Sequence, residues 1–467
     1  MPLLKPEPTP SISELPGIVP GSPGLHLDYL AALGHDLIPY GIFAGLLLVA
    51  WAVAGAVLAR KAPHTWWLLY GFWFLRLRMG RSWQRLCLNA GLTTASRRAV
   101  PARTERPVLP LLIKVRPRRN GATAMICFSA GQTPAQFIEA ADAMAHAWRV
   151  HAVRAIASGR GRVKLTILND DPLMGIPESL GTYLQRASLR QAGEAPTMDD
   201  LVATVGSRED GERWTINLLL FPHWLITGAT QSGKSTLINA AVSQWATRPV
   251  ALVGIDCKGG MELGPHAPRL SALATDRQQA ASLLERLVRE ANRRMVLCRD
   301  HQHRNIWQLP KPLRPVPVIV IVDELAELYL VASRDEKEAA LKATTNLLRL
   351  AQLGAALGIH LVVAGQRVGS DFGAGVTALR AQLGGRICLA VNDKETAVMT
   401  LGDLYPDAVE AAQLISPAEK GVAITTAEWD GWIRARSINF PPDALDAAME
   451  AAAHLAPSLP GIDSALL

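Results

Sequence analysis

The sequence predicts an α/β protein whose largest part is an open, doubly wound parallel sheet. Two observations after residue 205 lead to this class. Continuous apolar runs recur, as expected for strands buried on both faces of a parallel sheet; they lie at 224–227, 250–255, 316–322, 360–364 and 386–391. Helical patterns at 276–298 and 336–358 alternate with these runs. Such alternation is typical of strand–helix–strand units and therefore of a doubly wound domain.

The N-terminal residues indicate a membrane anchor. Residues 1–36 are rich in Pro, Gly and Ser, and we expect a disordered tail there. Residues 37–59 carry no charge over 23 positions, so a helix would reach roughly 34 Å and could cross a hydrocarbon core of about 30 Å. A buried core helix and a signal peptide are the alternatives, but the residues before 37 are acidic, whereas a signal peptide begins with basic residues.

Charge predicts the orientation of this anchor. The net charge is +7, yet residues 76–119 contain twelve Lys or Arg and one acid, Glu105, while residues 120–467 sum to −3. Because positive residues stay on the cytoplasmic side, we expect a cell-membrane protein with its tail outside and everything after residue 60 in the cytoplasm. The aromatic residues 62–75 favour a helix lying in the membrane interface, and a second crossing is the alternative.

These features divide the chain into six segments. After the tail we expect a membrane anchor at 37–75, a basic linker at 76–105 and a small α/β module at 106–204; the doubly wound domain follows at 205–440 and a C-terminal tail at 441–467. The module shows no chemical motif, so we expect a structural role. Its pattern predicts strands and one helix near 134–150. The five cysteines are scattered and odd in number, which favours a reduced compartment.

A phosphate-binding loop follows the first apolar run. Gly228, Gly233, Lys234 and Ser235 form the pattern GxxxxGKS between an expected strand and an expected helix. Glycines let backbone N–H groups wrap a phosphate, and the helix N-terminus adds its positive end. We predict that Lys234 reaches the β- and γ-phosphates of ATP and that the Ser235 hydroxyl binds Mg²⁺; a turn that binds nothing is the alternative. The predicted nucleotide-binding residues are Gly228, Ala229, Thr230, Gln231, Ser232, Gly233, Lys234, Ser235 and Thr236.

Two adjacent acids complete the predicted site. Asp323 and Glu324 directly follow the apolar residues 318–322. At the carboxyl end of a parallel strand, Asp323 can hold Mg²⁺ through water, and Glu324 can orient and deprotonate the attacking water. A helix N-cap followed by an acidic first turn is the alternative. Together the two motifs predict an ATPase that uses ATP and Mg²⁺.

The order of these motifs resembles the RecA-like, additional-strand class of P-loop NTPases. One apolar strand lies between the two motifs, Glu324 directly follows the metal-site acid, and Gln366 ends the next strand in the segment AGQR. The resemblance implies that Gln366 contacts the γ-phosphate or the attacking water during catalysis. An ordinary polar residue at a strand end is the alternative.

Four further segments resemble the FtsK/SpoIIIE family. They are GIDCKGGMEL (254–263), LVREANRRMVLCRDHQHRNIWQL (287–309), GIHLVVAGQR (358–367) and GGRICLAVNDKETAVMTLGD (384–403). The resemblance covers roughly residues 205–440. It implies a homo-hexameric ring, tethered to the membrane, that pumps double-stranded DNA through its pore. It also implies that Arg386 stabilises the γ-phosphate in a neighbouring subunit; a structural arginine at a strand end is the alternative.

The layout departs from that of chromosome-segregating members, which have several spans and a C-terminal winged helix. Fewer than thirty residues follow the last expected strand here. The chain is therefore more similar to transfer ATPases of actinobacterial conjugative plasmids and integrative elements, which implies DNA transfer alongside other plasmid transfer proteins. A type VII-like protein secretion ATPase, a chromosome-segregation pump and a regulatory NTPase are the alternatives. The segment 365–386, with Arg367 and Arg380, is our candidate for gripping DNA phosphates, unless it is only a flexible loop.

Overall fold

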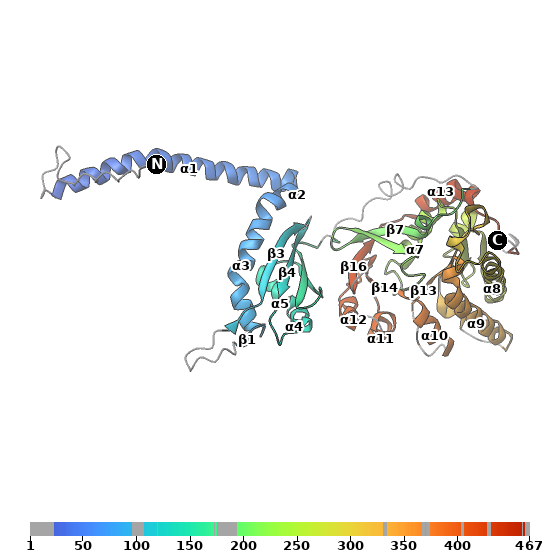
Figure 1. The fold of residues 1–467 in the computed structure, drawn as a ribbon. Coiled ribbons are helices and arrows are strands. Elements are labelled where there is room, and N and C mark those ends of the chain that lie inside the picture. Colours follow the sequence, from blue (N-terminus) through green and yellow to red (C-terminus); the bar gives the residue numbers. More distant parts are fainter. Residues whose placement is uncertain are drawn as a thin grey trace, which may run out of the picture. The chain divides into compact units, whose positions relative to one another are not determined.

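The computed structural model divides into two compact units, Met1–Arg81 and Ser82–Leu467 (Figure 1). The structure describes residues 23–95, 107–118, 120–171, 173–174, 194–329, 334–366, 369, 374–402, 406–426, 431–459 and 461–462.

The first unit consists of helical segments that meet at a break. Helix α1 (Pro23–Lys61) ends before Ala62, whose backbone leaves the helical region with φ −145° and ψ 68°. The chain resumes as α2 (Pro63–Trp66), a π-helical turn η2 (Trp67–Gly71) and α3 (Phe72–Asn89). The ring centroids of Trp51 and Tyr70 lie 4.7 Å apart, so the start of the second segment packs against α1.

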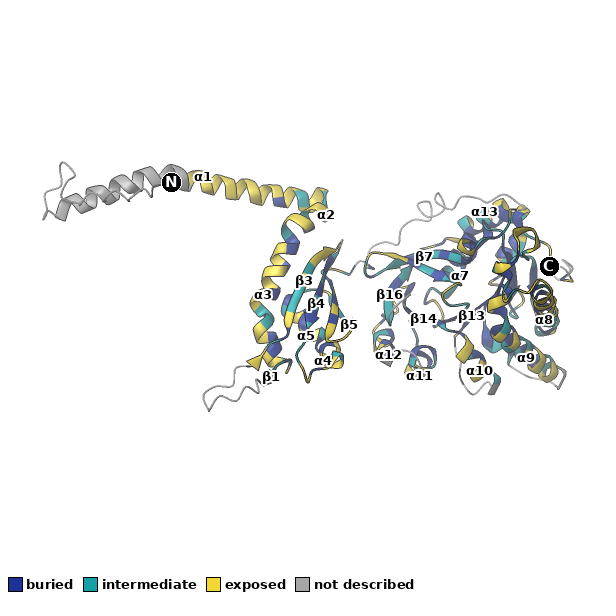
Figure 2. Ribbon diagram, in the orientation of Figure 1, coloured by how far each residue is buried: buried dark blue, intermediate teal, exposed yellow. Residues whose placement is uncertain are grey.

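Among the described helices, one is long and apolar enough to cross a membrane. It is the stretch Ile42–Lys61, with a mean hydropathy of 2.5 and only 6% of it buried. Figure 2 shows this part of α1 exposed along its length. The aromatic residues 62–75 begin a helical segment that runs on to Asn89.

Two boundaries predicted in this region differ from the structure. Helix α1 begins at Pro23, so residues 23–36 are helical where a disordered tail was expected; proline is well tolerated in the first turn of a helix. Residues 76–89, expected in a linker, continue α3, because its buried apolar residues recur at helical spacing. Residues 1–22 of the expected tail lie outside the described residues.

A small α/β module opens the second unit, after a short ribbon of β1 (Thr94–Ala95) and β2 (Pro107–Val108). Its antiparallel sheet has the order β3-β4-β6-β5. The strands are β3 (Leu111–Arg118), β4 (Gly121–Cys127), β5 (Ala152–Ala157) and β6 (Arg162–Leu168). Where one helix was expected, α4 (Pro134–Glu139) and α5 (Ala141–Trp148) meet at Ala140. The buried Trp148 ring lies 6.2 Å from that of Trp83, which ties the end of α3 to the module.

The rest of the second unit is built on one ten-stranded sheet. Six strands are parallel, in the order β11-β10-β12-β13-β9-β14. They are β9 (His223–Thr227), β10 (Ala251–Ile255), β11 (Ala272–Ala274), β12 (Val318–Val322), β13 (Ile359–Gly365) and β14 (Gly385–Leu389). The predicted parallel α/β sheet is confirmed. The order places the strand before the phosphate-binding loop in the interior of the sheet.

Beyond β14 the sheet continues with antiparallel strands. The sequence had predicted only the parallel part. The order there is β15-β16-β7-β8. These strands are β7 (Val202–Arg208), β8 (Arg213–Asn217), β15 (Val422–Thr426) and β16 (Trp432–Ser437). A hairpin from the end of the domain thus pairs with a hairpin from its beginning.

Helices cover both faces of the sheet (Figure 1). The helices α7 (Lys234–Ala246) and α13 (Pro442–Ala452) contribute to one core, and α8 (Arg277–Asp300), α9 (Arg334–Leu357) and α10 (Ala374–Gln382) to the other. Successive strand residues such as Leu225 and Ile226 enter opposite cores, as the period of a strand requires. A smaller layer of α11 (Lys394–Ala397), η9 (Val398–Gly402) and α12 (Pro406–Gln413) covers β14 and β15.

Part of the expected C-terminal tail belongs to this core. Leu445 and Met449 of α13 are buried one helical turn apart in the same cluster as α7. Leu459 and Ile462 join the core on the opposite face. The chain after 441 therefore stabilises the sheet that carries the phosphate-binding loop.

A buried ion pair fixes α8 to the sheet. Arg294, whose side chain is 1% exposed, donates to Glu290 Oε1 at 2.7 Å. It also donates to the backbone oxygens of Val316 at 2.8 Å and Leu357 at 2.9 Å, which precede β12 and β13. The Glu and paired Arg of the family-like segment 287–309 therefore have a structural role: they set the starts of two central strands.

We expect Arg294→Met to lower the free energy of unfolding by about 3 kcal/mol, because Glu290 and two carbonyls lose a buried donor. Arg299→Met is the matched control on the same helix, since the Arg299 side chain is 74% exposed, and it should shift stability by less than about 0.5 kcal/mol. Urea titration of the detergent-solubilised protein measures both. Equal stability of Arg294→Met and wild type would contradict the structural role.

Candidate nucleotide-binding site

The loop between β9 and α7 folds back on itself at the carboxyl edge of the parallel strands. Gln231 and Gly233 have positive φ angles of 65° and 104°, and Ser232 N–H donates to Ala229 O at 3.1 Å. A Cβ on Gly233 would lie 2.7 Å from Gly421 N, so glycine is required for both conformation and close approach. The loop ends at the N-terminus of α7, where unpaired N–H groups favour an anion.

A cavity of about 510 Å³ opens at this loop. Seven of the nine predicted nucleotide-binding residues line it: Ala229, Thr230, Gln231, Gly233, Lys234, Ser235 and Thr236. Gly228 and Ser232 are buried beneath the surface of the loop. Asp323 and Gln366 line the same cavity. The structure thus brings residues from three parts of the sequence around one space.

Lys234 lies beside the two predicted acids. Its Nζ donates to Asp323 O at 3.2 Å and lies 3.5 Å from Glu324 Oε2, and its side chain is 11% exposed. The contact crosses from α7 to the end of β12, although β13 separates β9 from β12 in the sheet. The lysine therefore places a positive charge at the carboxylates.

Asp323 is a buried carboxylate with no donor among the described residues. It is 1% exposed, and neither Oδ1 nor Oδ2 accepts a hydrogen bond from them. Burial raises the pKa of Asp323 to about 6, although Lys234 acts in the opposite direction. Because a buried carboxylate is costly unless a cation or donor satisfies it, these oxygens fit a divalent metal ion such as Mg²⁺. Ser235 supplies a hydroxyl to the same cavity.

Glu324 is held by the backbone of the next strand. Gln366 N–H lies 3.1 and 3.2 Å from the two Glu324 carboxylate oxygens. Lys258 Nζ lies 3.7 Å from Oε2, and Glu324 is 7% exposed. The contact of Gln366 with Glu324 is therefore made by the backbone N–H of Gln366. Gln366 itself is exposed and lines the cavity. Glu324 also faces an adjoining cavity of about 300 Å³.

Arg386 lies away from this cavity. It is 3% exposed at the start of β14, and its guanidinium donates to Arg380 O at 2.6 Å. Its backbone N–H donates to Thr426 Oγ1 at 2.9 Å. This geometry is that of a structural arginine, the alternative that the sequence left open. Action on a neighbouring subunit stays a prediction and requires this side chain to leave its buried position.

Lys258 was not predicted as a site residue, although the sequence contained a signal for it. Asp256 directly follows β10, and its carboxylate accepts from the N–H groups of Lys258, Glu262 and Leu263 at 3.2, 2.8 and 3.0 Å. These bonds fold the loop that brings Lys258 to Glu324. The signal was the Asp-x-Lys segment from Asp256 to Lys258, which follows β10, the strand next to β12.

The antiparallel strands supply a second group of unpredicted residues. Lys420 and Gly421, in the turn before β15, and Arg436 and Ser437, at the end of β16, line the cavity. Gly421 N–H donates to Ser232 O at 2.8 Å, which holds this turn against the phosphate-binding loop. No spacing in the sequence connects these residues with the loop, because antiparallel pairing of β15 with β14, the neighbour of β9, places them there. Of the proposed DNA-gripping arginines, Arg380 is on α10 and Arg367 lies outside the described residues.

Comparisons with known proteins identify the family of this chain. A model of the FtsK/SpoIIIE family matches residues 194–312 and 307–370, and a model of the actinomycete conjugal transfer protein N-terminal domain matches residues 53–169. Transfer protein TraSA of Streptomyces ambofaciens is 40% identical over 350 residues, 72% of this chain and 80% of that protein. A sporulation regulatory protein of Streptomyces azureus is 48% identical over 242 residues, 52% of this chain and 80% of that protein.

More distant matches concern the doubly wound domain alone, called the motor below, or the fold alone. DNA translocase FtsK of Bacillus anthracis is 34% identical over 218 residues, 42% of this chain but 26% of that protein. The structure of the pCW3 conjugation coupling protein TcpA, in its monomer form with ATPγS, has a TM-score of 0.50 and 20% identity; the match covers 74% of this chain and 94% of that one. At this identity the likeness concerns the fold alone.

The sequence match to TraSA extends over four fifths of that protein, and the family model covers the phosphate-binding loop and both acids. The chain belongs to the FtsK/SpoIIIE family and is an ATPase.

Proposed function

We propose that this chain is a membrane-anchored ATPase that moves double-stranded DNA in conjugative transfer. The match to transfer protein TraSA carries the proposal, because it extends over four fifths of that protein. The matching N-terminal domain bears the description of an actinomycete conjugal transfer protein. The match to a DNA translocase over the motor supports DNA as the cargo. Other plasmid transfer proteins are the proposed further partners.

In this proposal the cavity at Lys234 is where ATP is hydrolysed. The loop from Gly228 to Thr236 binds the phosphates through its N–H groups, and Lys234 attracts the β- and γ-phosphates. Ser235 and Asp323 hold Mg²⁺, which neutralises developing phosphate charge when bound. Glu324 accepts a proton from the attacking water, and the Gln366 N–H fixes the orientation of that carboxylate. Six copies form the proposed ring.

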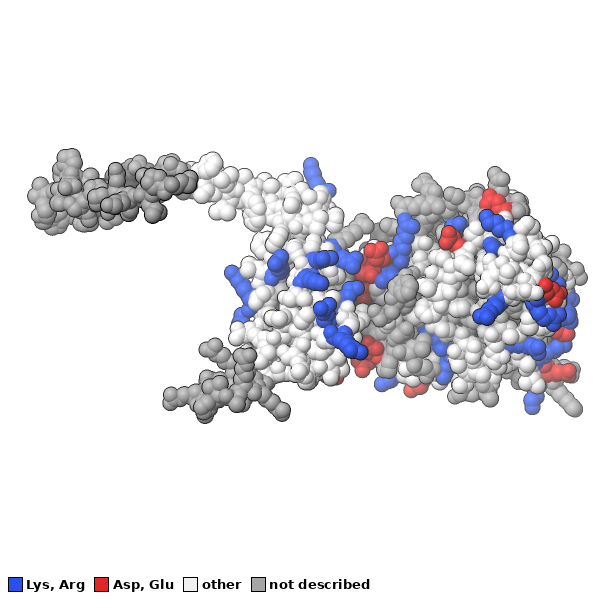
Figure 3. Space-filling model, in the orientation of Figure 1, with Lys and Arg blue, Asp and Glu red and all other residues white. Residues whose placement is uncertain are grey.

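Exposed apolar and basic side chains in the segments that follow α1 support the membrane part of the proposal. Beyond the apolar stretch of α1, Leu69, Trp73, Phe74 and Leu77 are each at least half exposed. Lys and Arg gather over α3 and β3, two elements without an Asp or Glu (Figure 3). Aromatic and basic side chains together favour an interface with anionic lipid headgroups. We propose that the module and motor lie in the cytoplasm.

Substitutions separate nucleotide binding from hydrolysis. Lys234→Ala should weaken ATP binding at least about tenfold, because the phosphates lose a charge-assisted donor. Glu324→Gln should bind ATP normally but turn over at least about a hundredfold more slowly, because shape is kept and the base is lost. Binding of a fluorescent ATP analogue and phosphate release measure the two steps. Normal turnover by Glu324→Gln would remove the assigned base.

Double-stranded DNA of any sequence should stimulate the ATPase. Since a transport pore grips phosphates, raising NaCl from 50 to 200 mM should weaken apparent DNA affinity by about a hundredfold for about four contacts. Steady-state hydrolysis against DNA concentration at both salts measures this. Two unrelated DNA sequences should behave alike.

The matched control is Glu324→Gln, which should bind DNA with the same salt dependence without hydrolysing ATP. Wild-type hydrolysis indifferent to DNA, under conditions where the protein forms rings, would contradict the DNA proposal. Stimulation by a secreted protein substrate instead would favour protein export.

The anchor should consist of a spanning part and an interfacial part. Full-length protein should require detergent for extraction from membranes, whereas a chain lacking residues 1–61 should be released by about 1 M NaCl, because only interfacial and ionic contacts remain. Trp73→Ser with Phe74→Ser should release that shortened chain at lower salt. Membrane sedimentation followed by extraction measures each step. Full-length protein in the soluble fraction would rule out the anchor.

A further inference from the structure

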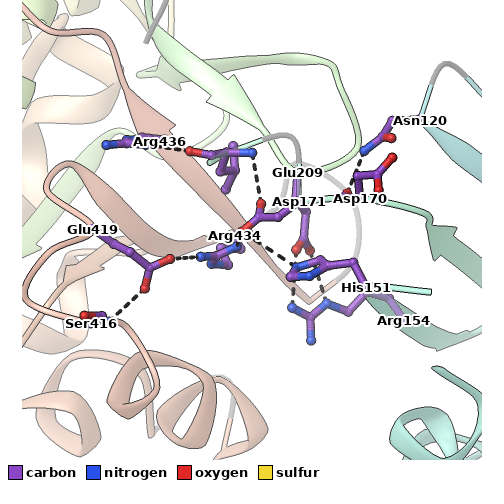
Figure 4. Close-up of polar contacts among 11 residues, drawn as sticks. Asn120, His151, Arg154, Asp170, Asp171, Glu209, Ser416, Glu419, Arg434 and Arg436 are labelled. Carbon is purple, nitrogen blue, oxygen red and sulfur yellow. Dashed lines mark hydrogen bonds and ion pairs between the residues drawn. The ribbon is translucent and has the colours of Figure 1, made fainter. Parts of the chain in front are cut away.

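The module and the motor meet through two ion pairs (Figure 4). The module supplies the cation of one pair and the anion of the other. Arg154 of β5 binds Glu209, in the turn after β7, with nitrogen–oxygen distances of 3.2 and 3.3 Å. Arg434 of β16 binds Asp171, just after β6, at 2.7 Å. The Glu209 and Asp171 side chains are only 4% and 8% exposed. Each part thus gives one cation and one anion, and desolvated pairs of this kind define a register between surfaces.

Further contacts support a specific contact surface. The Arg154 guanidinium lies 4.5 Å from the centroid of the Trp432 ring in β16. Burial acts to raise the pKa of Asp171, but hydrogen bonds from Arg434 and the Leu173 backbone outweigh it and lower that pKa. Glu209 N–H also donates to Arg434 O at 2.9 Å, so both ion pairs act on the same strand.

The same strand holds the turn before β15. Arg434 forms a second ion pair, with Glu419, which in turn accepts from Ser416 N–H at 2.8 Å. Arg436 donates to Leu173 O at 2.6 Å, just after Asp171, and to Lys420 O at 3.2 Å. The two arginines therefore connect the end of the module to the turn from Ser416 to Gly421.

This turn is a wall of the nucleotide cavity. Gly421 N–H donates to Ser232 O at 2.8 Å, and Ser437 N–H donates to Gly421 O at 2.9 Å. Lys420, Gly421 and Arg436 line the cavity together with Lys234. A continuous set of polar contacts thus runs from Asp171 in the module to the phosphate-binding loop.

We propose that Arg434 and Arg436 are positioning residues that use the docked module to hold the turn at Gly421 against the phosphate-binding loop, so that docking raises the affinity for ATP. The proposal rests on the ATP site assigned above. By linkage, ATP binding must strengthen docking by the same factor. The nucleotide affinity of the motor is then set by a part of the chain that does not touch the nucleotide.

Arg154 and Glu209 provide the test, because neither lines the cavity. In full-length protein in detergent, Arg154→Glu and Glu209→Arg should each raise the dissociation constant of fluorescent ATPγS about tenfold. The double variant, which restores the opposite charges, should return to within about threefold of wild type. The KM for ATP should follow these values while kcat at saturating ATP stays within about twofold. Arg162→Glu, an exposed arginine on β6, is the control and should bind as wild type does.

A second readout separates coupling from general damage. Hydrogen exchange of β5 and β16 should slow when wild type binds ATPγS, and should not respond in Arg154→Glu. If Arg154→Glu does not fold, as judged by circular dichroism, Asp171→Asn keeps the side-chain shape and should raise the dissociation constant about threefold. Single variants with wild-type affinity, or a double variant as weak as the singles, overturn the coupling. Failure of wild type to bind, or Lys234→Ala binding equally well, overturns the ATP site itself and the coupling with it.

Discussion

Two adjacent carboxylates at the end of β12 are the constraint on which the motor depends. Asp323 and Glu324 are almost fully buried, and buried charge is costly unless cations or N–H groups face it. The surrounding elements provide these groups: Lys234 from the helix after β9, Lys258 from the loop after β10, and the N–H of Gln366 at the end of β13. Parallel strands make this convergence possible, because their carboxyl ends meet at one edge of the sheet.

The antiparallel strands have a different task from the parallel ones. They bring the turn at Gly421 against Gly233, where two glycines permit an approach that a Cβ on Gly233 would block. On its way to that turn, β16 carries the arginines that face the module. One strand therefore serves as both a wall of the cavity at Lys234 and a contact surface for the N-terminal module.

The sequence was most informative where a residue pattern has a single physical explanation. Apolar runs located the parallel strands, and the glycine spacing located the loop around Lys234. It was least informative where a role depends on distant pairing. Arg294 and Arg386 are both buried, and residue type alone does not reveal where an arginine side chain lies. Lys420 and Arg436 reach the cavity because β15 pairs with β14, which lies next to β9 in the sheet. The helical spacing of Leu445 and Met449 was present in the sequence but was read as part of a tail.

The central claim, that hydrolysis at Glu324 moves the protein along double-stranded DNA, is most directly tested by displacement of a third DNA strand. The substrate is a long duplex with a short triplex near one end, mixed with the full-length protein in detergent and ATP. The account predicts that wild type displaces the third strand with a delay that lengthens with distance along the duplex, and that Glu324→Gln displaces none. A wild-type protein that hydrolyses ATP on this DNA but never displaces the strand would contradict the account.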